Sequence, residues 1–495
     1  MEIEQKDVDS SASTKNPTLF QAFVPLVILI VLLGTNVYLF GDDTLSGSNQ
    51  IALLLAAAIA ALIAFKNGFK WEILQDGMVK SISSAMSAII ILLMIGALAG
   101  TWMISGVVPA MIYYGLKILN PTIFLFAAVV VSAVVSMATG SSWSTIATVG
   151  VALLGIGKAL GLDEGIIAGA IISGAYFGDK MSPLSDTTNL APAMAGTDLF
   201  THIRYMAYTT GPSIAITLVI FFIWGFTVST DGTSDQIPAI LGALDSTFNI
   251  NPFLFLVPAA VIFMIIKKVP ATPALLAGSL LGGVFAIIFQ PHIFSQIADG
   301  TNSIQITYIA IMKAMYTSIS ITTDHPMVND LLSTSGMAGM LNTIWLIVCA
   351  MIFGGIMEAG GMLQRIAKEI IKLAHSTGSL IASTAASCVF FNVTASDQYL
   401  AIVVPGRMFR TTFRDRGLKP EVLSRTLEDA GTVTSVLVPW NTCGATQATV
   451  LGVSTMVYAP FCFFNIISPF MTIIFGYLDF KIRRFSKEEE EKLAA

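Results

Sequence analysis

The chain contains apolar runs that are long enough to cross a lipid bilayer. The stretch Ala22–Leu39 carries no charged residue, and a bilayer core needs about 20 predominantly apolar residues in helical form. A transmembrane β-barrel would show alternating segments of about ten residues instead. The runs predicted to span are Leu19–Phe40, Ile51–Phe65, Ser84–Ile104, Pro212–Val228, Pro252–Ile266, Pro273–Phe289, Asn342–Met357 and Met456–Phe475. The sequence therefore predicts an all-α polytopic membrane protein.

Composition excludes the main soluble alternatives. Of the 495 residues, 55% are hydrophobic and 12% charged, whereas soluble domains carry about 25% charged residues. So few charges cannot cover a water-facing surface of this size. Lys and Arg number 26 against 31 Asp and Glu, so no basic surface for nucleic acid is expected.

The distribution of Lys and Arg predicts the orientation in the membrane. Basic residues gather at 66–80, 365–372 and 407–419, whereas the loops 41–50 and 229–249 have none. Cationic loops stay in the cytoplasm, so we expect an inner-membrane protein with both termini cytoplasmic. The predicted segments are a cytoplasmic tail (1–18), a first repeat (19–228), an extracytoplasmic linker (229–250), a second repeat (251–478) and a cytoplasmic tail (479–495).

Two apolar regions must enter the membrane and return. Both ends of Gly378–Pro405 are predicted to be cytoplasmic, and both ends of Pro121–Gly161 extracytoplasmic. Each is followed by an interrupted apolar helix. The two halves then have opposite orientation, which is the inverted-topology repeat of many secondary transporters, each repeat with a re-entrant hairpin and an interrupted transmembrane helix. Residues 306–340 have no counterpart in the first half and are read as an insertion.

The bends and breaks concentrate oxygen-bearing side chains. Irregular backbone at membrane depth is tolerated where it is buried in protein or lines a wet cavity, and a hard cation such as Na⁺ takes oxygen ligands. The candidate ion-binding residues are Ser141, Ser142, Ser144, Asp179, Ser185, Asp186, Thr187, Thr188, Asn189, Asn392, Thr394, Ser396, Asp397, Asn441 and Thr442. Among them, Asp186, Asn189, Asp397 and Asn441 are the predicted Na⁺ ligands.

The acidic residues have competing interpretations. An Asp at the membrane centre costs about 2.5–3.5 kcal/mol on insertion scales, which favours a functional role for Asp186 and Asp397 over a structural pairing with a helix terminus. A carboxylate in such a site can hold either Na⁺ or H⁺. Asp179 and Lys180 are adjacent and can be read as a local ion pair. The pair 428–429 can be read equally well as solvated acids at a helix start.

One motif carries a family resemblance. The stretch Phe177–Ala193 (FGDKMSPLSDTTNLAPA), followed by Asp198–Ile203, closely resembles the signature of the NhaC-type sodium/proton antiporter family. Glu428–Ser435 and Val438–Gly444 are similar to that family too, and the resemblance extends over Ser84–Tyr477. It implies an ion-binding role for Asp186, Ser185, Thr187 and Asn189. Relatives of that family include malate/lactate exchangers.

The expected function is therefore secondary transport, with Na⁺ exported in exchange for H⁺ by alternating access. The alternative is a malate-H⁺/Na⁺-lactate antiporter of the same family. A channel or an intramembrane protease is disfavoured, because broken helices opposite hairpins suit alternating access and no catalytic dyad is visible. The sequence has no nucleotide-binding or Cys/His metal motif, so no cofactor is expected. The expected partners are Na⁺, H⁺ and the lipid bilayer, with an organic anion and a homodimer left open.

The predicted orientation is testable by labelling. In a background without Cys349, Cys388, Cys443 and Cys462, Ser46→Cys should react with an impermeant thiol reagent from outside the cell. Arg414→Cys should react only after the inner face is exposed. Labelling of Arg414→Cys from outside would contradict the predicted hairpin at Gly378–Pro405, because that segment would then have to cross the membrane.

Overall fold

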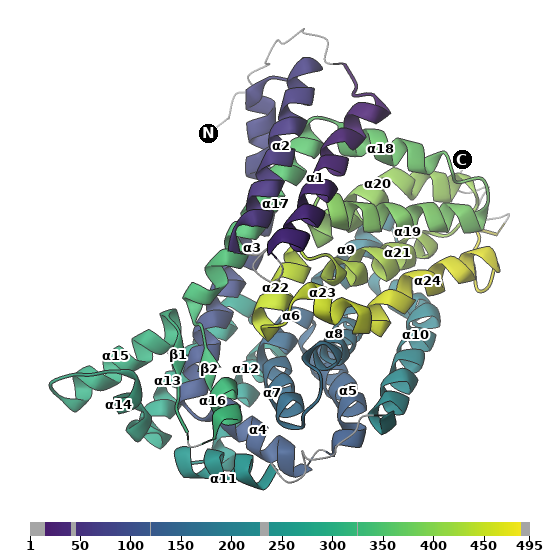
Figure 1. Cartoon of the computed structure of the whole chain (residues 1–495). Helices are drawn as coiled ribbons and strands as arrows, with labels where there is room; N and C mark the ends of the chain where they lie inside the picture. The colour runs from purple at the N-terminus through teal and green to yellow at the C-terminus, as the bar shows by residue number, and fades with distance from the viewer. Residues whose placement is uncertain (1–14, 41–45, 119, 228–236, 324, 487–495) are drawn as a thin grey trace, which may run out of the picture.

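The computed structural model describes residues 15–40, 46–118, 120–227, 237–323 and 325–486. Within these ranges, eight helices are long and apolar enough to cross a membrane, or ten if each of two bent helix pairs is counted as one span. The described residues of every predicted run fall in helix except Cys462, where the last run is bent by 56° between Phe461 and Phe463, and Val228 lies outside the described residues. The protein is a multi-pass α-helical membrane protein, as predicted (Figure 1).

The first half consists of helices only. They are α1 (Leu19–Phe40), α2 (Ser48–Lys66), α3 (Trp71–Ile104), α4 (Val107–Ile118), α5 (Pro121–Thr139), α6 (Ser142–Thr145), the π-helical turn η2 (Ile146–Gly150), α7 (Val151–Ala159), α8 (Glu164–Met181), α9 (Asp186–Ala195) and α10 (Leu199–Thr227).

The second half adds one short sheet. Its elements are α11 (Ile237–Thr247), η3 (Pro252–Phe255), α12 (Leu256–Ile266), α13 (Ala271–Phe289), η4 (Pro291–Ile293), α14 (Phe294–Ile297), α15 (Ser303–Tyr316), β1 (Ile319–Ser320), α16 (Pro326–Leu331), β2 (Ser333–Thr334), η5 (Met337–Met340), α17 (Leu341–Ala359), α18 (Met362–Ile371), α19 (Thr377–Thr394), α20 (Gln398–Asp415), α21 (Pro420–Leu427), the π-helical turn η6 (Glu428–Thr432), η7 (Ser435–Leu437), α22 (Thr442–Leu451), α23 (Thr455–Tyr458), η8 (Ala459–Phe461) and α24 (Phe463–Tyr477). Strands β1 and β2 are antiparallel.

Several predicted segments fall partly outside the described ranges. Most of the tail 1–18, part of the linker 229–250 and part of the tail 479–495 lie there. The described part of the linker forms α11.

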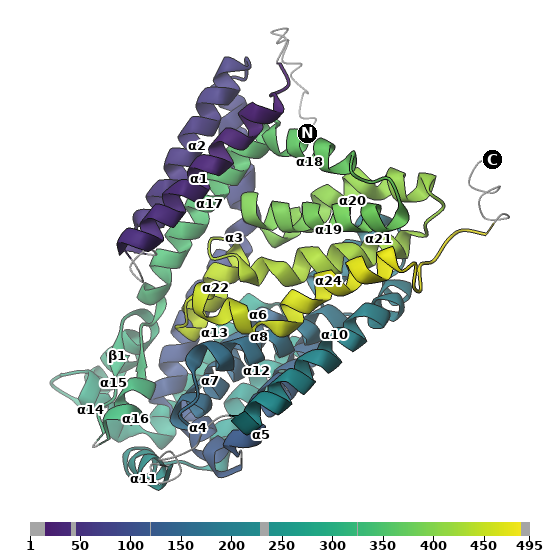
Figure 2. The ribbon, with the colours of Figure 1, turned by 45° about the vertical axis from the view of Figure 1, so that its right-hand side comes forward.

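Helix pairings recur between the two halves. Helix α3 packs on α13, and α17 packs on α2; likewise α10 packs on α5, and α24 packs on α19. Helices of one half also contact broken-helix segments of the other half: α24 packs on α8, and α10 packs on α21. Figure 2 shows α10 and α24 together on the side of the molecule away from α1, α2 and α17. The pairings place the hairpins and broken helices between the long helices of both halves.

Helix α3 is shared by two apolar cores. Its first part belongs to a core with residues of α1, α2 and α17, which includes Leu92, Ala57 and Ile347. Its last part belongs to a core with residues of α5, α8 and α13, which includes Trp102 and Ile171. One 34-residue helix therefore joins both cores.

The insertion packs tightly on α3 through small residues. A Cβ atom at Gly100 would lie 1.7 Å from the backbone oxygen of Ala314 in α15, and one at Gly96 would lie 2.6 Å from the oxygen of Gly336. Small residues four apart let backbones approach closely at membrane depth, where no hydrophobic force drives helices together. The insertion thus contacts α3 closely at Ala314 and Gly336.

Gly100→Ala should destabilise the protein by about 1–3 kcal/mol or more, since the added methyl group overlaps a backbone oxygen that cannot rotate away. The thermal unfolding midpoint of the purified protein in detergent measures this. Gly211→Ala is the matched control, because an added Cβ at Gly211 in α10 meets no atom within 4 Å. Equal midpoints for the two variants would contradict the close packing.

Candidate functional site

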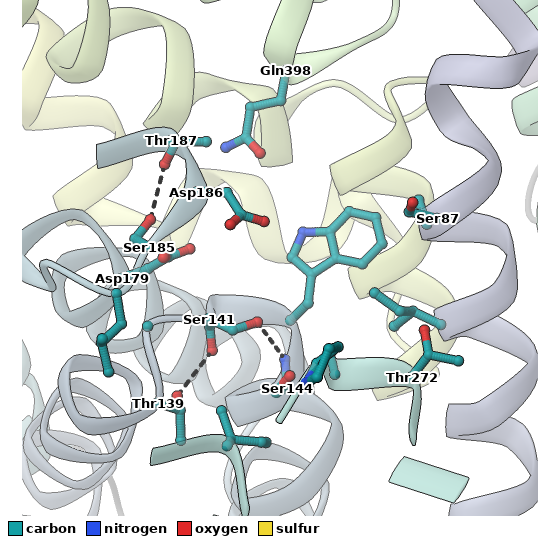
Figure 3. A pocket seen from close by; sticks show the side chains of 18 of the residues that line it. Ser87, Thr139, Ser141, Ser144, Asp179, Ser185, Asp186, Thr187, Thr272 and Gln398 are labelled. Atoms are coloured by element: carbon teal, nitrogen blue, oxygen red, sulfur yellow. Dashed lines mark hydrogen bonds between the residues drawn. The ribbon is translucent and has the colours of Figure 1, made fainter. Parts of the chain in front are cut away.

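A cavity of ≈ 670 Å³ lies where the two halves meet. It is bounded by the first hairpin bend, both helix breaks, α3 and the loop between α12 and α13. Most of the predicted ion-binding residues line it together: Ser141, Ser144, Asp179, Ser185, Asp186, Thr187, Asn189, Asp397 and Thr442. Figure 3 shows Asp186 and Gln398 near one another on one side of this space, with Ser87 and Thr272 on the other side.

The first broken helix exposes a carboxylate to the cavity. Helix α8 ends at Met181, and α9 begins at Asp186, whose side chain is exposed. Ser185 caps α9 by accepting from the backbone N–H of Thr188. The Thr188 hydroxyl donates to the backbone oxygens of Asp179 (3.3 Å) and Lys180 (3.0 Å), so it satisfies carbonyls that the break leaves free.

The first hairpin bend is tied to this break. The chain reverses at Gly140, whose φ of 69° is left-handed, and a Cβ there would lie 2.5 Å from the Cβ of Leu184. Beyond the bend, the backbone N–H and the hydroxyl of Ser142 both donate to Oδ2 of Asp179, at 3.1 and 2.7 Å. Ser141 caps α6 by accepting from the N–H of Ser144 at 3.2 Å. Asp179 therefore holds the bend against α8.

The second hairpin bend and the second break are joined by backbone contacts. Ser396 has a left-handed φ of 58°, and its backbone oxygen accepts from the N–H of Thr442 at 3.0 Å. Asp397 is 2% exposed and caps α20 by accepting from the N–H of Leu400 at 2.9 Å. The Asn441 amide donates to the backbone oxygen of Asn392 at 3.0 Å. Bend and break meet, as in the first half.

Some predicted residues do not line the cavity. The Thr394 hydroxyl donates to the Phe390 carbonyl of its own helix at 2.7 Å. Asn392 donates to the Gly431 oxygen at 2.7 Å, and Asn441 caps α22 by accepting from the Cys443 N–H at 3.0 Å. These groups support the bend and the break from behind. Ion ligation by Asn441 stays a prediction.

The predicted local ion pair between Asp179 and Lys180 is wrong. Both charged side chains of the actual pair, Lys180 and Asp429, are fully buried, and Lys180 also donates to Ser468 at 2.9 Å. Thr209 donates to the other oxygen of Asp429 at 2.8 Å. Adjacent residues on a helix face different directions, so Lys180 reaches across to the second half instead.

The alternative that Glu428 and Asp429 are solvated is wrong as well. Both are fully buried, in the π-helical turn η6. One carboxylate oxygen of Glu428 accepts from the Thr187 hydroxyl at 3.1 Å. An acidic residue inside the membrane is functional by default, and this rule would have selected Glu428 and Asp429. The sequence does not show, however, whether the two residues lie inside the membrane or at its surface, because they follow a basic loop closely. Gln398 and Tyr399 were missed too, and both line the cavity.

The cavity is suited to a hard cation. Its oxygens come from carboxylates, hydroxyls and amides on several segments. The hydroxyl oxygens of Ser185 and Thr187, for example, lie 3.2 Å apart. In the described part of the chain, no three His, Cys, Asp or Glu side chains come together as in a transition-metal site. The N-termini of α6, α9, α20 and α22 also lie at this cavity, capped by Ser141, Ser185, Asp397 and Asn441, and their partial positive charge favours an anion instead.

Comparison with known proteins gives consistent matches. The profile of the Na⁺/H⁺ antiporter family matches residues 174–480. A Na⁺/H⁺ antiporter NhaC of Alkalihalophilus pseudofirmus is 38% identical over 87% of this chain and 90% of its own length. A malate-2H⁺/Na⁺-lactate antiporter of Bacillus subtilis is 36% identical over 93% and 95%. The arginine/ornithine antiporter ArcD of Halobacterium salinarum is 35% identical over 99% and 98%. The predicted family resemblance is confirmed.

The buried ion pair should be strongly coupled. Lys180→Gln or Asp429→Asn alone should destabilise the protein by about 3–5 kcal/mol, because each leaves one buried charge without its counter-ion. The double variant should lose less than the sum of the two single losses. Unfolding midpoints in detergent measure all three. Lys158→Gln is the control, because Lys158 and its partner Glu164 are 33% and 45% exposed, and such a surface pair contributes about 0–1 kcal/mol. Additive losses would argue against the pair.

Proposed function

The chain belongs to the Na⁺/H⁺ antiporter family, and on this premise we propose that it exports Na⁺ in exchange for H⁺. It is a multi-pass transporter with antiporters among its relatives. The proposed drive is the ion gradient, without a cofactor.

One observation carries the ion assignment. The carboxylate of Asp186 is exposed to a cavity that it shares with hydroxyl and amide oxygens from both halves of the chain. Asn189, one turn later on α9, and Ser185 and Thr187 beside it supply further oxygens. We assign Na⁺ binding to this group, with Asp397 on the opposite wall as the second carboxylate. Ligands from both halves allow the occupied site to influence how the halves pack.

Coupling then requires a single shared group. A carboxylate that holds Na⁺ releases its proton, and a carboxylate that holds a proton no longer attracts Na⁺. Competition at Asp186 is therefore sufficient to exchange one ion for the other without a second transport site. Asp179 accepts two hydrogen bonds from Ser142, one from the backbone N–H and one from the hydroxyl. Its proposed role is therefore to position the hairpin bend.

We propose that the two halves form an inverted-topology repeat. We also propose that the protein lies in the inner membrane with both termini in the cytoplasm. The recurring pairings of α3 with α13 and of α17 with α2 support it, as do those of α10 with α5 and of α24 with α19. The basic loops at 66–80 and 407–419 support the direction.

Organic-anion exchange is the second candidate function. The cavity volume falls within the range of small-molecule sites, about 300–1,000 Å³, and is far larger than a bare Na⁺ requires. Four helix N-termini, which favour negative charge, end at it, and Lys268 lines it. The carboxylates at Asp186 and Asp397 oppose an anion at the same positions. The malate/lactate relative keeps this candidate open.

Asp186→Asn should reduce Na⁺-driven exchange to background, because it removes the group that both ions share while preserving side-chain volume. The measurement is the dissipation of an imposed pH gradient in proteoliposomes on addition of Na⁺. Asp299→Asn is the matched control, an exposed carboxylate that does not line the cavity. Normal exchange in Asp186→Asn would refute the assigned role.

The same vesicles separate the two candidate functions. The native protein should dissipate the gradient with Na⁺ alone. Parallel assays with malate inside and lactate outside test the second candidate, because both are organic anions. A strict requirement for an organic solute would make organic-solute exchange the function, with Na⁺ as a co-substrate at most.

A further inference from the structure

A second cavity, of ≈ 580 Å³, lies along the last part of α3, next to the first cavity, which lies along its middle. Its walls are α3, α4, α7, the last turn of α22 and the insertion. The insertion contributes mostly hydroxyl-bearing residues, which are Ser318, Ser320, Ser333, Thr334 and Ser335. No residue lines both cavities. In Figure 1, β1, β2 and α16 lie beside the part of α3 that is away from α1 and α2.

The two cavities follow one another along the same walls. On α3, the residues Ser84, Ser87, Ala88 and Ile91 line the first cavity, and Ile95, Ala99 and Met103 line the second. Steps of three or four residues keep them on one helix face. Ile91 and Ile95 are four residues apart, which is about 6 Å along a helix. The cavities are thus separated by roughly one turn of α3.

The same order holds on the other two walls. Thr442 at the start of α22 lines the first cavity, and Thr449 at its end lines the second. On the returning arm of the first hairpin, Ser144 lines the first cavity and Val151 the second. Three segments therefore pass from one cavity to the other in the same sense.

A thin layer of buried side chains closes the gap. Between the cavities, α22 packs against both α3 and η2. The buried side chains at this level are apolar at Leu92, Ile146, Ala147 and Ala445, and polar at Thr148, Thr446 and Gln447. Because all of them are buried, the layer separates the two cavities in this structure.

We propose that the second cavity is the opposite mouth of the transport path, with the α3–α22–η2 contact as its closed gate and the insertion as its fixed outer wall. This inference rests on the proposed transport function. The close approach of Gly96 and Gly100 to the insertion holds that wall on α3, so opening must come from α22 and η2. The occupant is a hydrated cation in passage.

The chemistry of the lining agrees with a cation. The last turn of α22, at Thr449–Gly452, presents the carbonyl end of a helix, which carries partial negative charge. Lys158 is the charged residue among the lining residues, and Glu164 neutralises it at 2.6 Å. A cavity lined by hydroxyl groups without a carboxylate binds a cation weakly, which suits a cation that passes through it.

Sidedness of labelling tests the path without measuring transport. In the background without native cysteines, Ser87→Cys and Ser320→Cys each place one thiol in one cavity. An impermeant methanethiosulfonate reagent, applied to right-side-out and inverted vesicles, should modify the two from opposite sides of the membrane. Modification of both from the same side would overturn the proposal. Opposite labelling in a protein that fails to exchange Na⁺ would leave the path standing and refute only the ion assignment.

A wedge in the second mouth gives an independent test. Ala99→Trp fills the cavity wall on α3 and should slow exchange at least tenfold, while Na⁺ still protects Ser87→Cys from the reagent. Ala277→Trp on α13 is the matched control, also half-buried but lining neither cavity. Full exchange by Ala99→Trp, or loss of exchange in both variants alike, would overturn the role of this cavity.

Discussion

The structure depends on one constraint: a backbone group at membrane depth has no water to bond, so every interrupted helix needs partners from elsewhere in the protein. The two breaks obtain them from the two hairpin bends. Asp179 receives two hydrogen bonds from Ser142, and the Ser396 carbonyl receives the Thr442 N–H. Each bend and break thus form a unit, and these units line the larger cavity, to which we assign ion binding.

Charge is distributed according to the same constraint. The charges of Lys180 and Asp429 satisfy each other in full burial and link the first half of the chain to the second. Asp186, in contrast, remains exposed and lines the cavity. The buried pair therefore links the two halves of the chain, whereas the carboxylate that faces the cavity is the one to which we assign ion binding. This division explains why an acidic residue near a helix break need not be an ion ligand.

Much of the fold was predictable because the signals are local. The length of an apolar run and the positions of Gly, Pro and Ser predicted the spanning helices, a bend within Met137–Thr145 and a break within Gly178–Pro192, and the structure places these at Gly140 and before Asp186. The pairing of Lys180 was not predictable, because Asp429 is 249 residues away and the choice between it and Asp179 depends on helix rotation. Gln398 and Tyr399 were not predicted for the same reason, because an amide or phenol group in a sequence does not show which cavity or neighbour it faces in the folded protein.

The sequence by itself determined the class of protein, the positions of its apolar runs, the polar segments that interrupt them, and the family. These follow from composition and from short motifs, which need no knowledge of neighbours. Only the tertiary structure decided which oxygens share a cavity, which acids are buried in pairs, and that the insertion lines a second cavity beside α3. Those facts depend on contacts between residues far apart in the chain, and packing alone fixes which side chain of a helix meets which neighbour.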